Sequence, residues 1–204
     1  MPFPPLTAPL KFYAVVPTAE WVERMVEAGA DTVQLRAKNL RGAALQREIE
    51  RSVVACAGSR TQLFINDYWR EAIAAGAYGV HLGQEDMDDA DLAAIATAGL
   101  RLGLSTYSVA ELDRALAAKP NYVASGTIFP TTTKDVATPP QGLDKLREYV
   151  RQAGDMPVVA IGGIDLGNAR AVLDTGAASL AVVRAVTEAD DPAAAVKAFQ
   201  ALWD

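Results

Sequence analysis

Apolar and polar residues follow a unit that recurs along the chain: a helix-like segment, a short stop that contains glycine, and a brief apolar run. A glycine just past a helix end suits the left-handed backbone of a helix cap, and the apolar run after it suits a buried parallel strand. We therefore expect each unit to fold as a helix followed by a strand. The clearest stops are Glu27-Ala28-Gly29-Ala30, Ala75-Gly76-Ala77, Ala98-Gly99 and Thr175-Gly176-Ala177.

The same pattern predicts eight strands that alternate with eight helices. Eight such pairs favour a single-domain α/β fold, the (β/α)8 TIM barrel, over a doubly wound sheet. Residues 1–10 are expected to be a Pro-rich N-terminal extension, and residues 11–204 the barrel. The strands are expected near residues 11–17, 32–36, 62–66, 78–82, 101–105, 121–126, 157–162 and 179–184. The helices are expected near residues 18–28, 41–57, 68–75, 88–98, 108–118, 142–153, 165–175 and 191–203.

Composition and charge limit the classes of partner. The chain has 204 residues, of which half are apolar and 22% charged, enough for one buried core. Its net charge of −6 has the wrong sign for broad binding to nucleic acid or anionic lipid. The N-terminus lacks the basic and apolar regions of a signal peptide, and no apolar run reaches the ~20 residues of a membrane span. We expect a cytoplasmic protein that binds small molecules and has no nucleic-acid or membrane partner. The sequence is compatible with a homo-oligomer.

Cysteine and histidine each occur once. Cys56 lies in an apolar helical pattern, which predicts a small buried hydrophobe rather than a nucleophile. His81 alternates with Val80 and Leu82, which predicts a hydrogen-bonded histidine inside the barrel. One histidine and one cysteine exclude a His/Cys metal cluster.

One predicted strand carries a polar row with two cations. Side chains alternate along a strand, so Gln34, Arg36 and Lys38 point to one face and Val33 and Leu35 to the other. The apolar row suits packing on helices, which leaves the polar row facing the middle of the fold, where unpaired charge is costly. Either an anionic ligand meets these cations there, or they end the strand and reach solvent.

Polar groups follow the carboxyl ends of this strand and of several other predicted strands. Barrel enzymes place their chemistry on the loops after these ends, so we expect the site there. The groups concerned are Arg36, Lys38, Asn66, Asp67, Gln84, Glu85, Asp86, Ser105, Thr131, Thr133, Lys134, Gly162 and Gly163.

Two aspartates at adjacent strand ends suit a hard cation. Magnesium takes one or two protein carboxylates and completes its shell with water and substrate oxygens, so Asp67 and Asp86 suffice. Alternatively, Asp67 caps the helix that begins near Tyr68. Glu85 adjoins Asp86, and spacing alone does not choose between them as the ligand.

Residues 126–140 are the longest irregular stretch, and such loops in compact domains often carry function. Hydroxyl groups and a lysine, at Thr131, Thr133 and Lys134, suit a phosphate clamp in a loop that covers the site. Gly162 and Gly163 end the seventh strand and either let backbone N–H groups approach a phosphate or merely permit a tight turn.

Five ordered blocks together resemble the thiamine phosphate synthase family, and the likeness runs from about Tyr13 to Thr187. The blocks are Val33-Gln34-Leu35-Arg36-Ala37-Lys38, Asn66-Asp67, Gly79-Val80-His81-Leu82-Gly83-Gln84-Glu85-Asp86, Phe129-Pro130-Thr131-Thr132-Thr133-Lys134 and Ala160-Ile161-Gly162-Gly163-Ile164. Two more stretches resemble proteobacterial members, Phe64-Ile65-Asn66-Asp67-Tyr68-Trp69-Arg70 and Pro139-Pro140-Gln141-Gly142-Leu143.

The resemblance implies a transferase that joins a hydroxymethylpyrimidine pyrophosphate to a thiazole phosphate and releases pyrophosphate, with Mg2+ as cofactor. It implies a dissociative reaction: pyrophosphate leaves, a pyrimidine methyl cation forms, and the thiazole nitrogen attacks it. Such a reaction needs cations arranged around the leaving group and no strong protein base. The catalytic residues that it implies are Arg36, Lys38, Ser105 and Lys134.

The resemblance also implies a ligand set for each group of the substrates. Asp67 and Asp86 would bind magnesium, and Ser105 would lie beside the pyrimidine and its leaving group. The pyrophosphate would be held by Gln34, Arg36, Lys38, Asn66 and Lys134. The thiazole substrate and its phosphate would meet Thr131, Thr133 and the backbone of Gly163 and Val183.

Two positions depart from the family pattern. Tyr107 stands where members often have histidine, which argues against a thiazole tautomerase of the related barrel subfamily, because that proton transfer uses a histidine there. Arg184 stands where serine is usual; it either contacts the thiazole phosphate, which we favour, or extends into water. A non-catalytic binder of thiamine precursors is a further alternative, but the complete set of cations and carboxylates argues against it.

Overall fold

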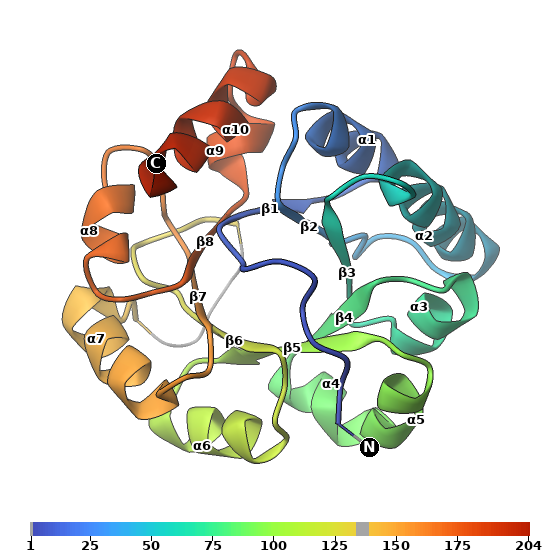
Figure 1. Ribbon diagram of the computed structural model, residues 1–204, viewed down its shortest axis with the longest axis horizontal. Helices are drawn as coiled ribbons and strands as arrows, with labels where there is room; N and C mark the ends of the chain where they lie inside the picture. The colour runs from blue at the N-terminus through green and yellow to red at the C-terminus, as the bar shows by residue number, and fades with distance from the viewer. Residues whose placement is uncertain (1, 134–138) are drawn as a thin grey trace.

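The alternating units close into a ring of eight parallel strands that helices surround, as the computed structural model shows (Figure 1). The structure describes residues 2–133 and 139–204. Each strand pairs in parallel with the next along the chain, and β8 returns to pair with β1, so the predicted TIM barrel is confirmed. The strands are β1 (Phe12–Val16), β2 (Thr32–Leu35), β3 (Gln62–Asn66), β4 (Gly79–Leu82), β5 (Arg101–Thr106), β6 (Tyr122–Ser125), β7 (Val158–Ile161) and β8 (Ser179–Val182).

The helices differ from the prediction mainly between β4 and β5. The sequence predicts one helix over residues 88–98, but the structure has two, because Asp91 accepts a hydrogen bond from Ala94 N (2.9 Å) and so caps a second helix. The short helix after β8 was not predicted either. The helices are α1 (Ala19–Glu27), α2 (Gly42–Cys56), α3 (Trp69–Ala75), α4 (Gln84–Asp89), α5 (Leu92–Thr97), α6 (Val109–Ala117), α7 (Gly142–Ala153), α8 (Ala169–Leu173), α9 (Arg184–Thr187) and α10 (Pro192–Gln200), followed by a 3-10 turn, Ala201–Trp203.

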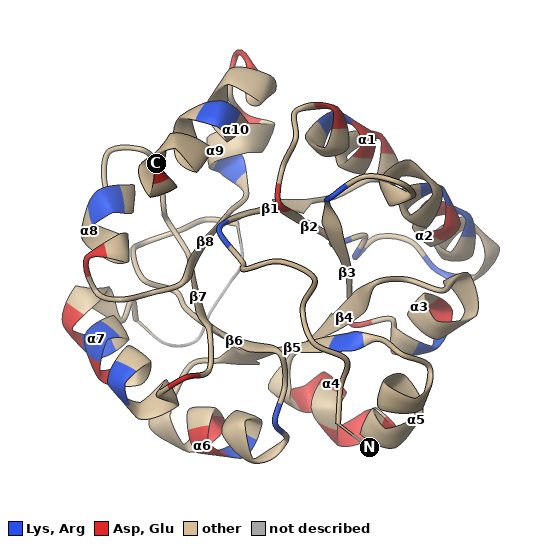
Figure 2. Ribbon diagram, in the orientation of Figure 1, with Lys and Arg blue, Asp and Glu red and all other residues tan. Residues whose placement is uncertain are grey.

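Alternation along the strands divides the buried side chains into two cores. Val33 and Leu35 are buried in the layer between strands and helices, as predicted. Tyr13, Phe64 and Tyr122 form a second, aromatic cluster inside the barrel. Figure 2 shows the complementary pattern: charged residues gather on the outer helices, whereas the strands carry few.

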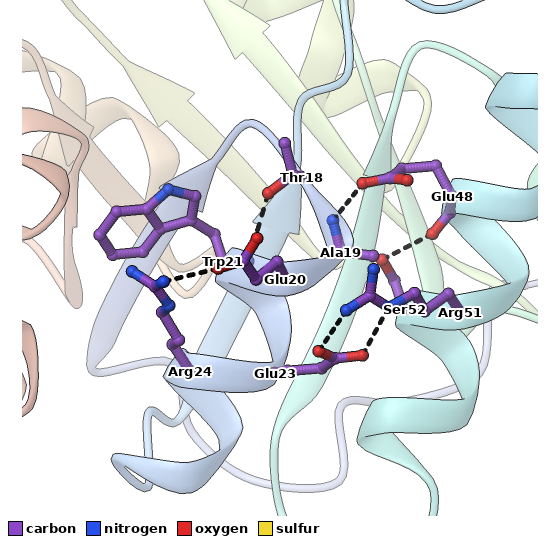
Figure 3. A network of polar contacts seen from close by, with 9 residues as sticks. All are labelled: Thr18, Ala19, Glu20, Trp21, Glu23, Arg24, Glu48, Arg51 and Ser52. Carbon is purple, nitrogen blue, oxygen red and sulfur yellow. Dashed lines mark hydrogen bonds and ion pairs between the residues drawn. The ribbon is translucent and has the colours of Figure 1, made fainter.

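Helices α1 and α2 lie side by side and share a network of polar contacts (Figure 3). Glu48 on α2 accepts a hydrogen bond from Ala19 N (2.5 Å), one of the amides at the start of α1 that have no partner within the helix. Arg51 donates two hydrogen bonds to Glu23, at 2.7 and 2.6 Å. These contacts join α1 to α2.

The N-terminal segment runs across one open end of the barrel before it enters β1 (Figure 1). Its carbonyl groups accept hydrogen bonds from residues next to strand starts: Pro4 from Asn121 (2.7 Å) and Pro5 from Arg101 (3.1 Å). The segment therefore covers the end of the barrel where the strands begin. Within residues 2–133 and 139–204, no helix is long and apolar enough to cross a membrane.

Candidate active site

A cavity of about 730 Å³ opens at the carboxyl ends of the strands. A volume of this size suits a small organic ligand. Because the strands are parallel and consecutive, residues far apart in the sequence meet around it, as the sequence predicts. The predicted site residues that line the cavity are Gln34, Arg36, Asn66, Ser105, Thr131, Thr133, Gly163, Val183 and Arg184.

Lys38, Asp67 and Asp86 do not line this cavity; Lys38 and Asp67 pair with each other just beyond the ends of β2 and β3. Asp67 has a left-handed backbone (φ 65°), which is uncommon for a residue other than glycine and is typical of functional sites. The alternative that Asp67 caps the next helix is wrong, because α3 begins after Tyr68 with no side-chain cap. The carboxylate is instead turned toward Lys38.

Asp86 completes an acidic pair with Asp67. It lies in the first turn of α4, where its Oδ2 accepts a hydrogen bond from Gly83 N (3.1 Å). Burial raises the pKa of Asp86 above its ordinary value, and the adjacent Asp67 raises it further through charge repulsion and a hydrogen bond between the two carboxyls. Glu85 points to solvent, so the structure selects Asp86 of these two neighbours.

The acidic pair fits a hard divalent cation by the chemistry of its donors. Two carboxylates that repel each other are stabilised by a cation between them, and magnesium needs no more from the protein. Within the part of the chain that the structure describes, no three or more His, Cys, Asp or Glu residues gather as a metal-ligating group. A site here would therefore depend on water and ligand oxygens for the rest of its shell.

Asn66 contributes a donor that has no partner. Its side chain is buried and lines the cavity next to Asp67, and its Nδ2 makes no hydrogen bond. A buried N–H group without a protein acceptor is costly, so a water or a ligand oxygen must accept from it. Arg36, half-buried in the same wall, adds a permanent positive charge. This side of the cavity thus carries an unpaired donor and a positive charge.

The double glycine after β7 serves the packing of the neighbouring loop. Gly162 and Gly163 have φ of 108° and 64°, and Phe129 N donates to Gly162 O at 3.0 Å. A Cβ at Gly162 would lie 2.7 Å from the backbone of Thr127, and one at Gly163 would lie 2.6 Å from Pro130 O. The tight-turn reading therefore holds, and the same turn also lines the cavity.

The loop after β6 approaches the end of β8. Thr131 and Thr133 share a hydrogen bond between their hydroxyls (3.3 Å), and Arg184 Nη1 donates to Thr132 Oγ1 at 3.1 Å. Arg184 is exposed at the cavity edge, at the start of α9. Lys134, the expected lysine of the phosphate clamp, lies outside the described residues.

The sequence reasoning missed the aromatic floor of the cavity. Tyr13 and Tyr122 line it, and His81, predicted only as an interior histidine, is hydrogen-bonded to Ser105 (2.8 Å). The signal was available, because these residues occupy inward positions of their strands. Cys56, in contrast, lies at the end of α2 and is half-buried rather than fully buried as predicted. This partial burial raises the pKa of its thiol to about 11, as expected for an unreactive residue.

Fold and site together define a (β/α)8 barrel with a cavity of ligand size at the carboxyl ends of its strands. Residues 12–186 match the family model described as thiamine monophosphate synthase. The chain belongs to this family, as its sequence motifs predicted.

Individual relatives agree over nearly the whole chain. The chain is 78% identical to the thiamine-phosphate synthase of Neisseria meningitidis serogroup B, over 100% of both proteins. It is 50% identical to that of Serratia proteamaculans, over 93% of this chain and 90% of the relative. Among solved structures, the thiamine phosphate pyrophosphorylase from Pyrococcus furiosus superposes with a TM-score of 0.81 at 33% identity, over 95% of each chain.

Proposed function

We propose that this chain condenses 4-amino-5-hydroxymethyl-2-methylpyrimidine pyrophosphate with 4-methyl-5-(2-hydroxyethyl)thiazole phosphate, forming thiamine phosphate and pyrophosphate. The observation that carries the proposal is the full-length match, at 78% identity, to a relative named for this product. The cavity supports it, because it is large enough for an organic ligand and carries an unpaired donor, Asn66 Nδ2, next to Asp67 of the acidic pair.

The pyrophosphate of the first substrate belongs beside Arg36, Lys38, Asn66 and Lys134. The strongest support is the Asn66 Nδ2 group, which is buried and lacks an acceptor. A pyrophosphate oxygen would satisfy this group while Arg36 and Lys38 balance the charge. We leave Gln34 out of this set, although the resemblance includes it, because its amide nitrogen already donates to Tyr13 (3.1 Å).

Asp67 and Asp86 would hold Mg2+, which when bound would neutralise negative charge on the pyrophosphate oxygens. Lys38 pairs with Asp67 and so lies between the acidic pair and the proposed pyrophosphate residues. This arrangement allows Asp67 to bind the cation while Lys38 binds the pyrophosphate.

The reaction breaks the bond between the pyrimidine methylene carbon and the pyrophosphate oxygen, and it forms a bond between that carbon and the thiazole nitrogen. The electron pair of the broken bond leaves with pyrophosphate, so negative charge grows where Arg36 and the neighbouring donors lie. The thiazole nitrogen supplies its own electron pair, and no protein base is required. Ser105, at the end of β5, would contact the pyrimidine.

The second substrate would occupy the side of the cavity formed by the loops after β6, β7 and β8. The loops after strands 7 and 8 are the frequent phosphate site of this fold. Arg184 lies there and already reaches across to Thr132. The thiazole phosphate would be bound by Thr131, Thr133, Arg184 and the backbone of Gly163 and Val183.

The test is incubation of the purified protein with both substrates and Mg2+, with thiamine phosphate and pyrophosphate measured together. We expect equal amounts of the two products, and none when either substrate is omitted. Isomerisation of the thiazole phosphate precursor without coupling would identify a tautomerase instead. Tight binding of both substrates without turnover would identify a binding protein.

A further inference from the structure

A chain of hydrogen bonds crosses the barrel along the floor of the cavity. It starts at Gln34 on β2 and ends at Ser105 on β5, and the residues between them come from β1, β6 and β4. The links are Gln34 Nε2 to Tyr13 Oη (3.1 Å), Tyr13 Oη to Tyr122 Oη (2.7 Å), Tyr122 Oη to His81 Nδ1 (2.9 Å) and His81 Nε2 to Ser105 Oγ (2.8 Å). All five residues line the cavity.

The strands leave space for this series of hydrogen-bonded side chains. A Cβ at Gly103, which pairs with Tyr122 across β5 and β6, would overlap the phenol ring. With glycine there, the Tyr122 ring lies across the barrel and stacks on the His81 ring, with centroids 5.6 Å apart. Phe64 packs against both tyrosines without a hydroxyl, so filling this space does not by itself require one. The two hydroxyls therefore need an explanation other than packing.

The two phenols stay protonated, so each has one proton to donate. Burial raises the pKa of Tyr13 and of Tyr122 well above the ordinary value for tyrosine. The amide nitrogen of Gln34 can only donate, so Tyr13 accepts from Gln34 and gives its own proton to Tyr122. Tyr122 then donates to His81 Nδ1, and the proton of the imidazole lies on Nε2 and is donated to Ser105.

This order of protons leaves a defined group at each end of the chain. The hydroxyl proton of Ser105 remains for another acceptor, because its oxygen already accepts from His81. At the other end, Gln34 Oε1 takes part in no hydrogen bond within the described residues. The cavity thus offers one donor on β5 and one acceptor on β2.

We propose that Tyr13, Tyr122 and His81 are positioning residues that hold this proton order, so that Ser105 donates to a ring nitrogen of the substrate and Gln34 accepts from its exocyclic amino group. This inference rests on the proposed function, whose aminopyrimidine substrate carries both groups. It adds the reason for selectivity: an oxo group in place of the amino group would set two acceptors, the oxo oxygen and Gln34 Oε1, against each other. The reverse order would require the Gln34 amide to turn over and would favour the oxo compound.

The first experiment uses the fact that His81 is the only histidine in the chain. Protein with 15N-labelled histidine gives the signals of one imidazole, so the protonated nitrogen is identified without mutation or substrate. We expect a neutral ring with the proton on Nε2. A proton on Nδ1, or on both nitrogens, near neutral pH would overturn the proposed order. This result does not depend on which reaction the protein catalyses.

The second experiment compares Tyr122→Phe with Tyr149→Phe as a matched control. Tyr149 is also buried, but its hydroxyl has no hydrogen-bond partner and lies on α7, away from the cavity. Steady-state rates are measured with the aminopyrimidine pyrophosphate, and its oxo analogue is measured as a competitive inhibitor. We expect Tyr122→Phe to raise KM for the aminopyrimidine substrate about 10- to 100-fold and to reduce its preference over the oxo analogue by about as much.

Three comparisons separate the outcomes. KM for the thiazole phosphate should stay unchanged in Tyr122→Phe, and all constants should stay unchanged in Tyr149→Phe. Unchanged selectivity in Tyr122→Phe, in a folded protein, would show that the hydroxyl chain is only structural. If Tyr122→Phe does not fold, the histidine spectrum of the unaltered protein still decides the proton order. An unaltered protein that forms no thiamine phosphate would refute the proposed function, whatever the spectrum shows.

Discussion

At the scale of single residues, the site is defined by groups that are unsatisfied within the protein. Asn66 Nδ2 has no acceptor within the protein, and Asp86 is half-buried beside a second carboxylate. This burial and the neighbouring Asp67 raise the pKa of Asp86. Each of these features is unfavourable in the protein alone and would be relieved by a ligand of opposite character. The sequence singles out these residues, and the structure adds the surroundings on which the proposed ligands rest.

The acidic pair should set the metal requirement. We expect Asp67→Ala and Asp86→Asn each to raise the Mg2+ concentration for half-maximal activity at least ~10-fold and to lower kcat about 10²-fold, because one carboxylate ligand is lost. Glu85→Gln is the matched control, since Glu85 is the exposed neighbour of Asp86. Activity is measured as Mg2+ is added to protein from which divalent cations have been removed with a chelator. Full activity of both aspartate variants in chelator would remove the metal assignment.

The cations should act on the departure of pyrophosphate more than on binding. We expect Arg36→Ala and Lys134→Ala to lower the single-turnover rate at saturating substrates by about 10²- to 10³-fold, because charge on the leaving group grows in the transition state. Arg147→Ala is a suitable control, since Arg147 pairs with Asp144 on α7, outside the cavity. A raised KM with an unchanged maximal rate would contradict this role.

Arg184 should act on the other substrate. A charge-assisted hydrogen bond contributes roughly 1.5–3 kcal/mol, so Arg184→Ser should weaken binding of the thiazole phosphate about 10- to 100-fold. Binding of the pyrimidine substrate should not change. Calorimetric titration of each substrate into both proteins measures this. Equal affinity for the thiazole phosphate would mean that the backbone alone binds the phosphate and that Arg184 only contacts the loop through Thr132.

At the scale of elements, the helices are held to one another as well as to the strands. Glu48 on α2 accepts from the first amide of α1, that of Ala19, as Figure 3 shows, and so caps a helix from outside it. A negative charge at a helix start also interacts favourably with the helix dipole. This contact joins the first two βα units and lies outside the residues that line the cavity.

Glu48→Ala should therefore affect stability without affecting catalysis. We expect the free energy of unfolding to fall by about 0.5–2 kcal/mol, as for the loss of other helix caps, and kcat to stay unchanged. Glu50→Ala on the same helix is the control, because Glu50 is exposed and its contact is to Gln46 one turn away. Denaturant unfolding of the two variants measures the difference. An equal loss in both variants would show that the effect does not come from the contact between Glu48 and Ala19 N.

At the scale of the whole molecule, the two ends of the barrel have different tasks. The cavity opens where the strands end, whereas the N-terminal segment covers the end where they begin. This division is common in the fold, in which the loops after the strands carry catalysis and the opposite end supports stability.

Removal of residues 2–9 should separate the two tasks. The deletion breaks the hydrogen bonds to Asn121 and Arg101 and the one from Thr7 N to the Tyr78 hydroxyl (2.8 Å). At about 0.5–1.5 kcal/mol for each hydrogen bond, we expect a fall of a few kcal/mol in stability, with kcat nearly unchanged at temperatures where the protein stays folded. Thermal unfolding and activity at low temperature test this. Loss of activity in the folded protein would show that the segment supports the site.

The sequence by itself determined the class of fold and the end of the barrel that carries the site. Glycine stops and alternating apolar runs are local signals, and parallel strands bring all their carboxyl ends to one edge. Arg36, Asn66 and Ser105 could therefore be assigned to the site from their place after each strand. The helix boundaries between β4 and β5 could not be predicted in the same way, because Asp91 caps a second helix within a continuous helical pattern.

Tertiary structure decided how these residues are paired. Asp86 rather than Glu85 meets Asp67, because α4 starts directly after β4 and turns one carboxylate inward and the other outward. Tyr13 and Tyr122 are 109 residues apart, and their hydroxyls meet only because the closed barrel sets β1 and β6 across a narrow interior. Local patterns show which way a side chain points, but only the closed ring decides which side chains from distant strands reach one another.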